Sequence, residues 1–304
     1  MLMRNRATAK TMLAALPLLL LPALMAGCHS VQSAPMGDAS RSDIHRSESG
    51  VVLSGDDEVL RCPLEGYSLV WHDEFDAPGI LKGEWTYQKA SAGWVNNELQ
   101  TYVERVAPSG KPVAECSEGT LKIHCFREED KVYSGRVYAN VGSGWKYGYF
   151  EASIKLPSGK GTWPAFWMMP VDFVSWPLDG EIDIMEEVGF HADYTSSSIH
   201  CENYNHVNGT QKTRERLCPK AEEEFHLYAL EWTEGYIRTY VDGEELFFFE
   251  NDGKGDKSTW PFDKPFYLIL NLAWGGNWGG AEGTDESALP VAMEIDFVRV
   301  FQKL

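Results

Sequence analysis

Short runs in which apolar and polar residues alternate recur along the last three quarters of the chain. In residues 150–156 an apolar side chain stands at every second position. This period of two is the spacing of side chains on one face of a β-strand. Two such runs fill residues 236–250 and are joined by Asp242 and Gly243, a pair that favours a tight hairpin turn. The pattern predicts strands that pair in antiparallel fashion.

Further strand-like runs occupy residues 119–126, 225–232, 266–274 and 293–302, with Gly, Pro, Asn and Asp between them. Such clusters of turn-forming residues separate short strands. The longest helical candidate, residues 219–230, contains three consecutive glutamates and is more typical of a solvated loop that leads into a strand. Many strands at close spacing predict an all-β fold of two stacked antiparallel sheets, a β-sandwich.

The composition indicates a folded domain with a large apolar core. The 304 residues are 43% hydrophobic and include 11 Trp, 13 Tyr and 14 Phe, which is ample for such a core. The formal net charge is −18, and a surface this acidic repels phosphate and sulfate groups. Nucleic acid is therefore not expected as a partner, and a neutral ligand fits better. We expect a monomer.

The first 28 residues resemble a bacterial lipoprotein signal. Three basic residues precede an apolar run that is short for a membrane span, and the run ends at Ala26, Gly27 and Cys28, similar to a lipobox. The resemblance implies a signal peptide at residues 1–27 and lipid attachment at Cys28. Such a protein is exported and anchored to a bacterial membrane or the cell surface. The alternative is an ordinary secretory signal with an incidental cysteine.

The chain changes character near residue 65. Residues 28–65 are rich in Ser, Asp and Gly and poor in aromatic residues, the composition of a flexible tether. Aromatic residues then recur every few positions to the end of the chain. We therefore predict one domain over residues 66–304.

Five cysteines follow the lipobox: Cys62, Cys116, Cys125, Cys201 and Cys218. In a compartment that permits disulfides, an odd number leaves at least one thiol unpaired. The spacing does not determine which cysteines pair. No Cys-x-x-Cys pair is present, so the sequence does not predict a zinc site.

Residues 179–189, DGEIDIMEEVG, gather four carboxylates on an otherwise apolar segment. As a strand, this segment places Glu181 and Asp183 on one face and the isoleucines on the other. Strict alternation would next place Met185 beside the two acids. One extra residue in a β-bulge returns Glu186 to their face, and bulges are frequent beside active sites. The segment therefore predicts a bulged strand that presents three acids together.

Three acids on one face cannot all ionise freely, because like charges raise one another's pKa. One protonated acid can donate to a leaving oxygen while an ionised acid about 5 Å away attacks an anomeric carbon, as in a retaining glycosidase. The pattern alone also fits a solvated acidic strand face or a calcium cluster.

The same segment is similar to the signature of glycoside hydrolase family 16, Glu-x-Asp-x-x-Glu on a bulged strand. Further matching segments, in the order expected of its bacterial laminarinase-like branch, cover nearly all of residues 67–302 and include VWHDEFD, NNELQTY, YGYFEASIKLP, WPAFWMMP, YVDGEELF and WPFDKPFYLILNLAWGGNWGG. The resemblance implies a jelly roll of the concanavalin A type. It also implies that Glu181 is the nucleophile and Glu186 the general acid and base. Asp183 would tune the nucleophile, and Glu187 has no catalytic role.

A sugar ring presents apolar C–H faces and a rim of hydroxyls, so a glycan cleft combines flat aromatic side chains with planar hydrogen-bonding groups. The resemblance places four residues in the cleft: Asn97, Trp163, Trp167 and His200. Two residues are predicted at its rim: Arg136 and Trp145. Gly-rich or Pro-bounded segments supply five more candidates: Trp94, Glu98, Trp274, Asn277 and Trp278. Each tryptophan has the alternative of packing in the core.

Many members of the family bind a structural calcium away from the cleft, and the matching positions here are Glu74, Gly119 and Asp296. Backbone carbonyls and one carboxylate would supply the hard oxygen ligands that calcium prefers. No cofactor is expected for catalysis itself.

The sequence as a whole predicts a retaining endo-β-glucanase that hydrolyses internal β-1,3 bonds, or mixed-linkage β-1,3-1,4 bonds, of polysaccharides such as laminarin. An agarase or another galactan hydrolase of the same family is one alternative, because agarose is nearly neutral. A non-catalytic surface protein that binds glycans on the same sandwich is another, although a pure binder has no need of crowded acids.

Overall fold

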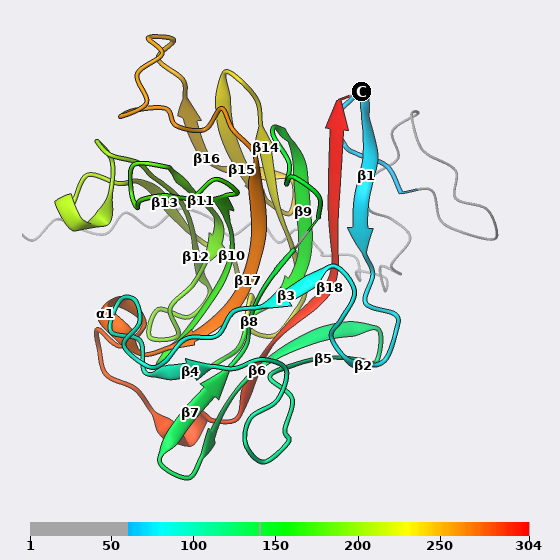
Figure 1. Cartoon of the computed structure of the whole chain (residues 1–304), viewed down its shortest axis with the longest axis vertical. Coiled ribbons are helices and arrows are strands. Elements are labelled where there is room, and N and C mark those ends of the chain that lie inside the picture. Colours follow the sequence, from blue (N-terminus) through cyan, green and yellow to red (C-terminus); the bar gives the residue numbers. More distant parts are fainter. Residues whose placement is uncertain (1–59, 140, 304) are drawn as a thin grey trace, which may run out of the picture. The chain divides into compact units, whose positions relative to one another are not determined.

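A computed structural model of the chain describes residues 60–139 and 141–303 (Figure 1). The predicted signal peptide, Cys28 and most of the predicted tether lie outside these residues. Cys62 is buried against Tyr149 and Phe301, so close packing begins before residue 66, where the sequence indicated the domain boundary. Among the described residues, no helix has the length and hydropathy needed to cross a membrane.

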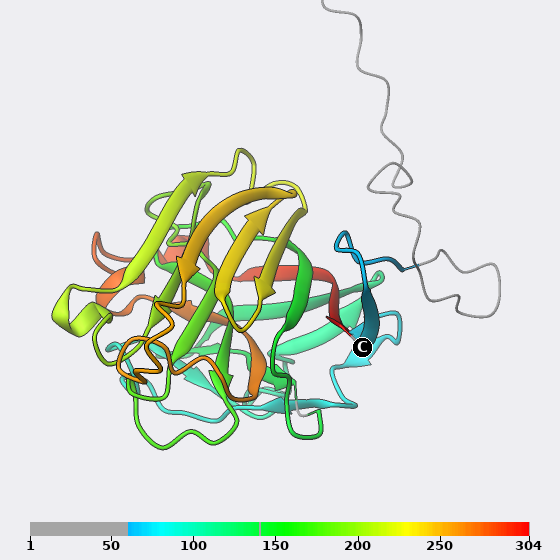
Figure 2. The same cartoon turned by 90° about the horizontal axis from the view of Figure 1, so that it is seen from above.

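The described residues form two sheets whose pairings are antiparallel except for β4 with β7. The first sheet comprises β3 (Trp85–Tyr87), β8 (Arg136–Ala139), β10 (Thr162–Pro170), β11 (Glu181–Glu186), β12 (Tyr194–His200), β13 (Lys212–Leu217) and β17 (Phe266–Trp274), in the order β13-β12-β11-β10-β17-β8-β3. Figure 2 shows this sheet from above, with the lime strand β13 at its outer edge. We call it the catalytic sheet below, because it carries the three predicted acids.

The second sheet, here called the supporting sheet, packs behind the first. It comprises β1 (Tyr67–Asp73), β2 (Gly79–Ile80), β4 (Gln100–Tyr102), β5 (Ala114–Ser117), β6 (Thr120–Glu128), β7 (Lys131–Ser134), β9 (Gly148–Lys155), β14 (His226–Trp232), β15 (Tyr236–Val241), β16 (Glu244–Glu250) and β18 (Val291–Lys303). The longest strand, β18, pairs in turn with β6, β9 and β1. The first and last strands of the described domain therefore lie side by side, and the predicted all-β jelly-roll sandwich is confirmed.

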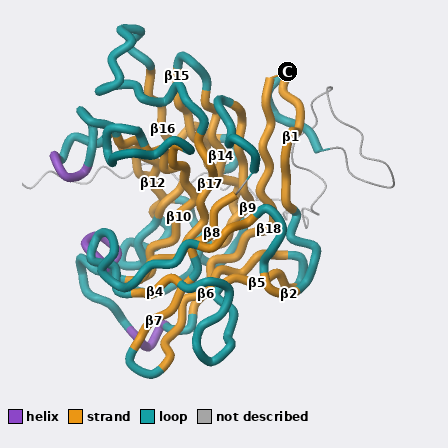
Figure 3. The backbone as a smooth tube through the Cα atoms, viewed as in Figure 1, coloured by secondary structure: helices purple, strands orange, loops and turns teal. Residues whose placement is uncertain are grey.

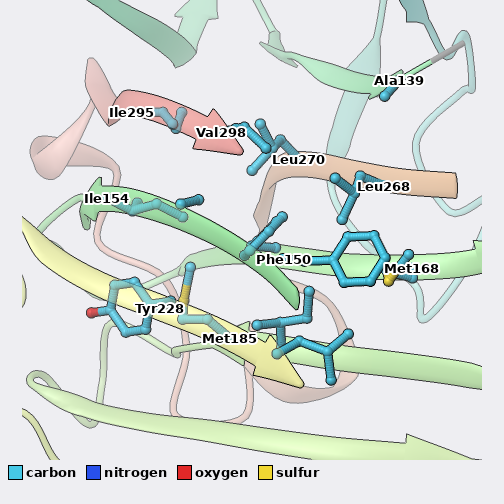
Figure 4. Close-up of a cluster of buried hydrophobic side chains, with 14 of the residues drawn as sticks. Ala139, Phe150, Ile154, Met168, Met185, Tyr228, Leu268, Leu270, Ile295 and Val298 are labelled. Carbon is cyan, nitrogen blue, oxygen red and sulfur yellow. The ribbon is translucent and has the colours of Figure 1, made fainter. Parts of the chain in front are cut away.

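Apolar side chains from both sheets meet in one large core (Figure 4). Phe150 and Ile154 of β9 enter it from the supporting sheet, while Met168 of β10 and Leu270 of β17 enter it from the catalytic sheet. All four are completely buried. The alternation read from the sequence is thus the alternation between this core and the outer face of each sheet.

Turns and short helices connect the strands (Figure 3). Asp242 and Gly243 join β15 to β16 with positive φ angles of 52° and 80°, the backbone geometry that a tight hairpin turn of this kind requires. The glutamate run at residues 222–224, predicted as a loop, lies in turns before β14. The helices of the described residues are α1 (Gly276–Gly279) and the single 3₁₀ turns η1 (His206–Asn208) and η2 (Glu286–Ala288).

All five cysteines beyond the lipobox are buried. Four of them are free thiols in the described structure: Cys116, Cys125, Cys201 and Cys218. The prediction that at least one thiol stays unpaired is therefore confirmed.

Candidate active site

The bulge predicted in strand β11 is present. Asp183 lies opposite Ser198 of β12, and Glu186 lies opposite Ser196, so three steps on β11 match two steps on its neighbour. The extra residue turns both Ile184 and the following methionine into the core, where each is at most 1% exposed. Glu186 is thereby returned to the outer face of the catalytic sheet, as the sequence predicted.

The three acids are crowded and shielded from water. Asp183 is 3% exposed, and burial raises its pKa well above the usual range. Burial, reinforced by the nearby Asp183 carboxyl, raises the pKa of Glu181 and of Glu186 to about 8. Because each negative charge opposes the next, the group holds at least one proton near neutral pH. One acid can therefore donate a proton while another remains ionised.

Each glutamate accepts a hydrogen bond from a different tryptophan. Trp163 Nε1 of β10 donates to Glu186 Oε1 at 3.0 Å, and Trp176 Nε1 donates to Glu181 Oε2 at 3.1 Å. Trp163 was predicted at the site, whereas Trp176 was not. Both bonds fix the orientation of a carboxyl group and favour its ionised form.

His200 lies at the end of β12 beside the nucleophile candidate. Its Nε2 is 3.3 Å from Asp183 Oδ2 and 3.8 Å from Glu181 Oε1. One donor atom from each of these three residues falls within a 4.8 Å cluster, so the cluster also has the size of a cation site. The His206 ring packs edge-on against His200, and its centroid lies 4.7 Å from that of the Trp176 ring. These rings enclose the three acids at the Glu181 end.

An aromatic and cationic stack flanks the acids on the outer face of the sheet. The Arg136 guanidinium lies 4.6 Å from the Trp167 ring and 5.2 Å from the Trp94 ring. Trp94 is 49% exposed, while the Trp167 indole donates to Asn271 Oδ1 at 2.7 Å. Trp167 lies directly opposite Asp183 in the pairing of β10 with β11. The fold thus gathers Trp94, Arg136 and Trp167, all predicted for the cleft, beside the strand that carries the acids.

A second group joins the loop before β4 to helix α1. Asn97 Nδ2 donates to Asn277 Oδ1 at 2.8 Å, and the Trp278 ring packs edge-on against Trp163 with centroids 5.4 Å apart. Glu98 is buried and accepts a hydrogen bond from Gln100 Nε2 at 2.6 Å. Its charge raises the pKa of Glu186, but its carboxylate is held inward by the glutamine.

Two predicted substrate contacts are wrong. Trp274 is 1% exposed because it continues the core-facing alternation of Leu268, Leu270 and Leu272 along β17. Trp145 is 5% exposed and packs against Trp71 in the core, with ring centroids 5.3 Å apart. Both indoles support the sandwich from inside and have no surface to offer a sugar.

The three predicted calcium positions gather around β18. Asp73, the residue before Glu74, pairs with Val298, while Leu121, two residues after Gly119, pairs with Ile295. Asp296 occupies the bulge of β18 against β9. The Glu74 carboxylate is already bound by the Arg299 guanidinium at 2.7 and 2.9 Å. Because this side chain is engaged by Arg299, the backbone carbonyl of Glu74 is the group left for a calcium ion.

Sequence reasoning missed several residues that shape the site: Trp176, His206, Gln100, Asn271 and Tyr102, whose hydroxyl accepts a hydrogen bond from Asn271 Nδ2 at 3.3 Å. Trp176 precedes β11 by five residues and is followed by Pro177, a local signal that its side chain sits in a turn beside the strand. Asn271 stands at one of the alternate positions of β17 whose side chains face away from the core, and it pairs with Arg136 of β8. Its position could have been found from that alternation.

Three acids on a bulged strand, two of them oriented by indole N–H groups, define a carbohydrate-cleaving hydrolase with two catalytic carboxyl groups. The family model described as glycosyl hydrolases family 16 matches residues 115–299, and the chain belongs to that family. A relative from Rhodothermus marinus, described as a beta-glucanase, is 40% identical over 268 residues, or 83% of this chain and 91% of the relative.

Solved structures agree with this assignment. SCLam, described as a non-specific endo-beta-1,3(4)-glucanase, superposes with a TM-score of 0.75 at 41% identity, covering 80% of this chain and 94% of SCLam. The laminarinase from Rhodothermus marinus superposes with a TM-score of 0.73 at 41% identity, covering 78% of this chain and 98% of that enzyme. The resemblance recognised in the sequence is therefore confirmed.

Proposed function

We propose that the protein is a retaining endo-β-glucanase that hydrolyses internal β-1,3 bonds, or mixed-linkage β-1,3-1,4 bonds, of neutral glucans such as laminarin. The observation that carries the proposal is the return of Glu186 to the face of Glu181 by the bulge of β11. The glucan specificity is supported by similarity to proteins described as a beta-glucanase and a laminarinase.

The chemistry follows from the two tryptophan-bound glutamates. Protonated Glu186 donates its proton to the glycosidic oxygen as the C–O bond breaks, while ionised Glu181 forms an ester bond to the anomeric carbon. Glu186, now ionised, then takes a proton from water, whose oxygen displaces Glu181 from that carbon. Water is consumed, both carboxyl groups return to their starting states, and the configuration at the anomeric carbon is retained.

Asp183 is proposed to orient Glu181 by donating a hydrogen bond from its protonated carboxyl, because it lies between the two glutamates along the strand and burial raises its pKa well above the usual range. Trp94, Trp167 and Arg136 are proposed to contact sugar faces, since the half-exposed Trp94 ring continues the stack away from the acids. This geometry suits a chain-like substrate that extends beyond the cleaved bond.

The test is to incubate the purified protein with laminarin, mixed-linkage β-glucan, lichenan, agarose and carrageenan, and to measure the release of reducing ends. We expect release from laminarin and mixed-linkage glucan, with oligosaccharides of several lengths appearing early, as internal cleavage requires. Release from agarose alone would replace the glucan proposal by a galactan hydrolase. Binding of glucan without any release would identify a glycan-binding protein.

Metal removal separates hydrolysis from a cation-dependent adhesion site. A glycosidase of this type needs no metal for its chemistry, so activity measured briefly at low temperature should survive chelation. Loss of glucan binding with the chelator would instead indicate that Glu181, Asp183 and His200 hold a cation.

A structural calcium ion is proposed at the backbone carbonyls of Glu74 and Gly119 with the carboxylate of Asp296. The grouping of these positions around the bulge of β18 supports it. Chelation should then lower the melting temperature, and calcium should restore it. Replacing Asp296 with Asn should remove the response to calcium.

A lipid anchor at Cys28 is proposed to hold the exported, monomeric enzyme at a membrane or the cell surface. The support is the Ala26-Gly27-Cys28 sequence after an apolar run. Mass spectrometry of the mature N-terminus should find lipid on Cys28, and Cys28→Ser should release the protein from the membrane fraction. A mature protein cleaved elsewhere and without lipid would support the secretory alternative.

A further inference from the structure

A second cluster of metal-binding side chains lies apart from the acids. One ligand atom each from Cys218, His226 and Asp242 falls within 4.8 Å of the others. Cys218 directly follows β13, at the edge of the catalytic sheet, whereas His226 begins β14 and Asp242 directly follows β15 in the supporting sheet. The cluster therefore bridges the two sheets at one side of the sandwich.

The three side chains form a gradient from the core to solvent. Cys218 is 3% exposed, and the side chains of His226 and Asp242 are 12% and 52% exposed. A thiol, an imidazole and a carboxylate converge here, while the carboxylate remains open to water.

Hydrogen bonds hold the imidazole in place. His226 Nδ1 lies 2.7 Å from Asp242 Oδ2, and the Leu227 backbone N–H donates to Asp242 Oδ1 at 2.9 Å. The other ring nitrogen, His226 Nε2, is buried and faces the Cys218 thiol, a weak hydrogen-bonding group. Hydrogen bonds to Asp242 and Cys218 raise the pKa of His226 to about 10, so an ion that binds Nε2 displaces a proton.

A fourth donor stands next to the thiol. The Tyr228 hydroxyl lies 3.9 Å from Cys218 Sγ and comes from the same strand as His226. In a tetrahedral site with bonds of 2.0 to 2.3 Å, neighbouring ligand atoms are separated by roughly 3.3 to 3.8 Å. The sulfur of Cys218 and the hydroxyl of Tyr228 are therefore already close to this separation.

We propose that Cys218 Sγ and His226 Nε2 bind a thiophilic divalent transition metal, for which zinc is the natural probe, with the Tyr228 hydroxyl and water completing the coordination and Asp242 holding the imidazole through Nδ1. The donor set of sulfur, nitrogen and oxygen suits zinc and disfavours calcium, which takes oxygen ligands alone. The ion would clip the end of β13 to β14 and β15. Its role is to stabilise the sandwich, and it takes no part in hydrolysis.

The binding test uses Co²⁺ and Zn²⁺ on protein freed of metal by chelation under reducing conditions. Co²⁺ should bind one ion per chain and produce a near-ultraviolet thiolate-to-metal charge-transfer band, which Zn²⁺ then removes by displacement. Zn²⁺ should also raise the melting temperature, as a ligand specific to the folded state does. The absence of a thiolate band, or binding that does not saturate at one ion, would overturn the proposal.

Variants locate the site. Cys218→Ser should abolish the charge-transfer band, whereas Cys116→Ser, which removes another buried thiol outside the cluster, should leave it intact. Asp242→Asn keeps a residue that tolerates the positive φ of this turn and should weaken Zn²⁺ binding by more than about tenfold. An unchanged band in folded Cys218→Ser protein, or unchanged affinity in Asp242→Asn, would refute the assignment. Asp242→Asn keeps the proposal testable where the cysteine variant fails to fold.

Discussion

Trp163 Nε1 donates a hydrogen bond of 3.0 Å to Glu186 Oε1 across the pairing of β10 with β11. The bond stabilises the ionised carboxylate and so lowers the pKa of Glu186 against the effects of burial. In Trp163→Phe that pKa should rise. Because the general acid must be protonated, the alkaline limb of the kcat/KM profile should move to higher pH, by about one pH unit. An unchanged alkaline limb would show that Glu186 is not the acid.

Trp176 donates the corresponding hydrogen bond to Glu181. Replacing Trp176 should therefore shift the acidic limb of the pH profile rather than the alkaline one. In Trp176→Phe the ionised nucleophile loses a donor, so its pKa should rise. The nucleophile must be deprotonated, so the acidic limb of the kcat/KM profile should move to higher pH. The two phenylalanine variants serve as controls for each other. Movement of the same limb in both would contradict the separate roles given to the two glutamates.

The neighbours Glu186 and Glu187 should respond differently to the same substitution. Glu187 turns inward and is 1% exposed, and burial raises its pKa to about 10. It is therefore a neutral group at pH 7, and glutamine replaces it with little change in charge or volume. Glu187→Gln should retain activity and change the free energy of unfolding by less than about 1.5 kcal/mol, whereas Glu186→Gln should lose nearly all hydrolysis. Both variants are compared by reducing-end release and urea denaturation.

Trp94 and Trp145 provide a matched pair of exposed and buried tryptophans. Trp94→Ala should raise KM for laminarin several-fold and leave the melting temperature almost unchanged, because the ring is half exposed. Trp145→Ala should lower the free energy of unfolding by about 3 to 5 kcal/mol, since it opens a cavity in the core. Kinetics and thermal denaturation of both variants test the distinction. A stable Trp145→Ala protein with a selectively raised KM would restore the original prediction that Trp145 contacts substrate.

Local patterns predicted the parts of this molecule that local physics controls. The alternation in β11 and its single extra residue sufficed to place Glu181, Asp183 and Glu186 on one face. The same alternation in β17 places Trp274 on the core face with Leu270, whereas the glycine-rich segment after it had predicted a cleft position. Strand periodicity, and not the neighbouring loop, therefore determines where this indole points.

Other features depend on contacts between distant segments. Arg136 of β8 reaches Trp94 and Trp167 only because β17 pairs with both β8 and β10 and holds these two strands one strand apart. The contact of Trp176 with Glu181 depends on how the preceding turn folds back over the strand. The cluster of Cys218, His226 and Asp242 likewise forms only when the two sheets stack, and its ligands follow no short spacing motif in the sequence.

The central claim is that Glu181 attacks the sugar and carries the covalent intermediate. An activated 2-deoxy-2-fluoro β-laminaribioside would slow both steps and trap that intermediate. Proteolysis and tandem mass spectrometry then locate the added sugar. The account predicts one fluorosugar per chain, on Glu181. A fluorosugar on Glu186 or on any other residue would contradict it.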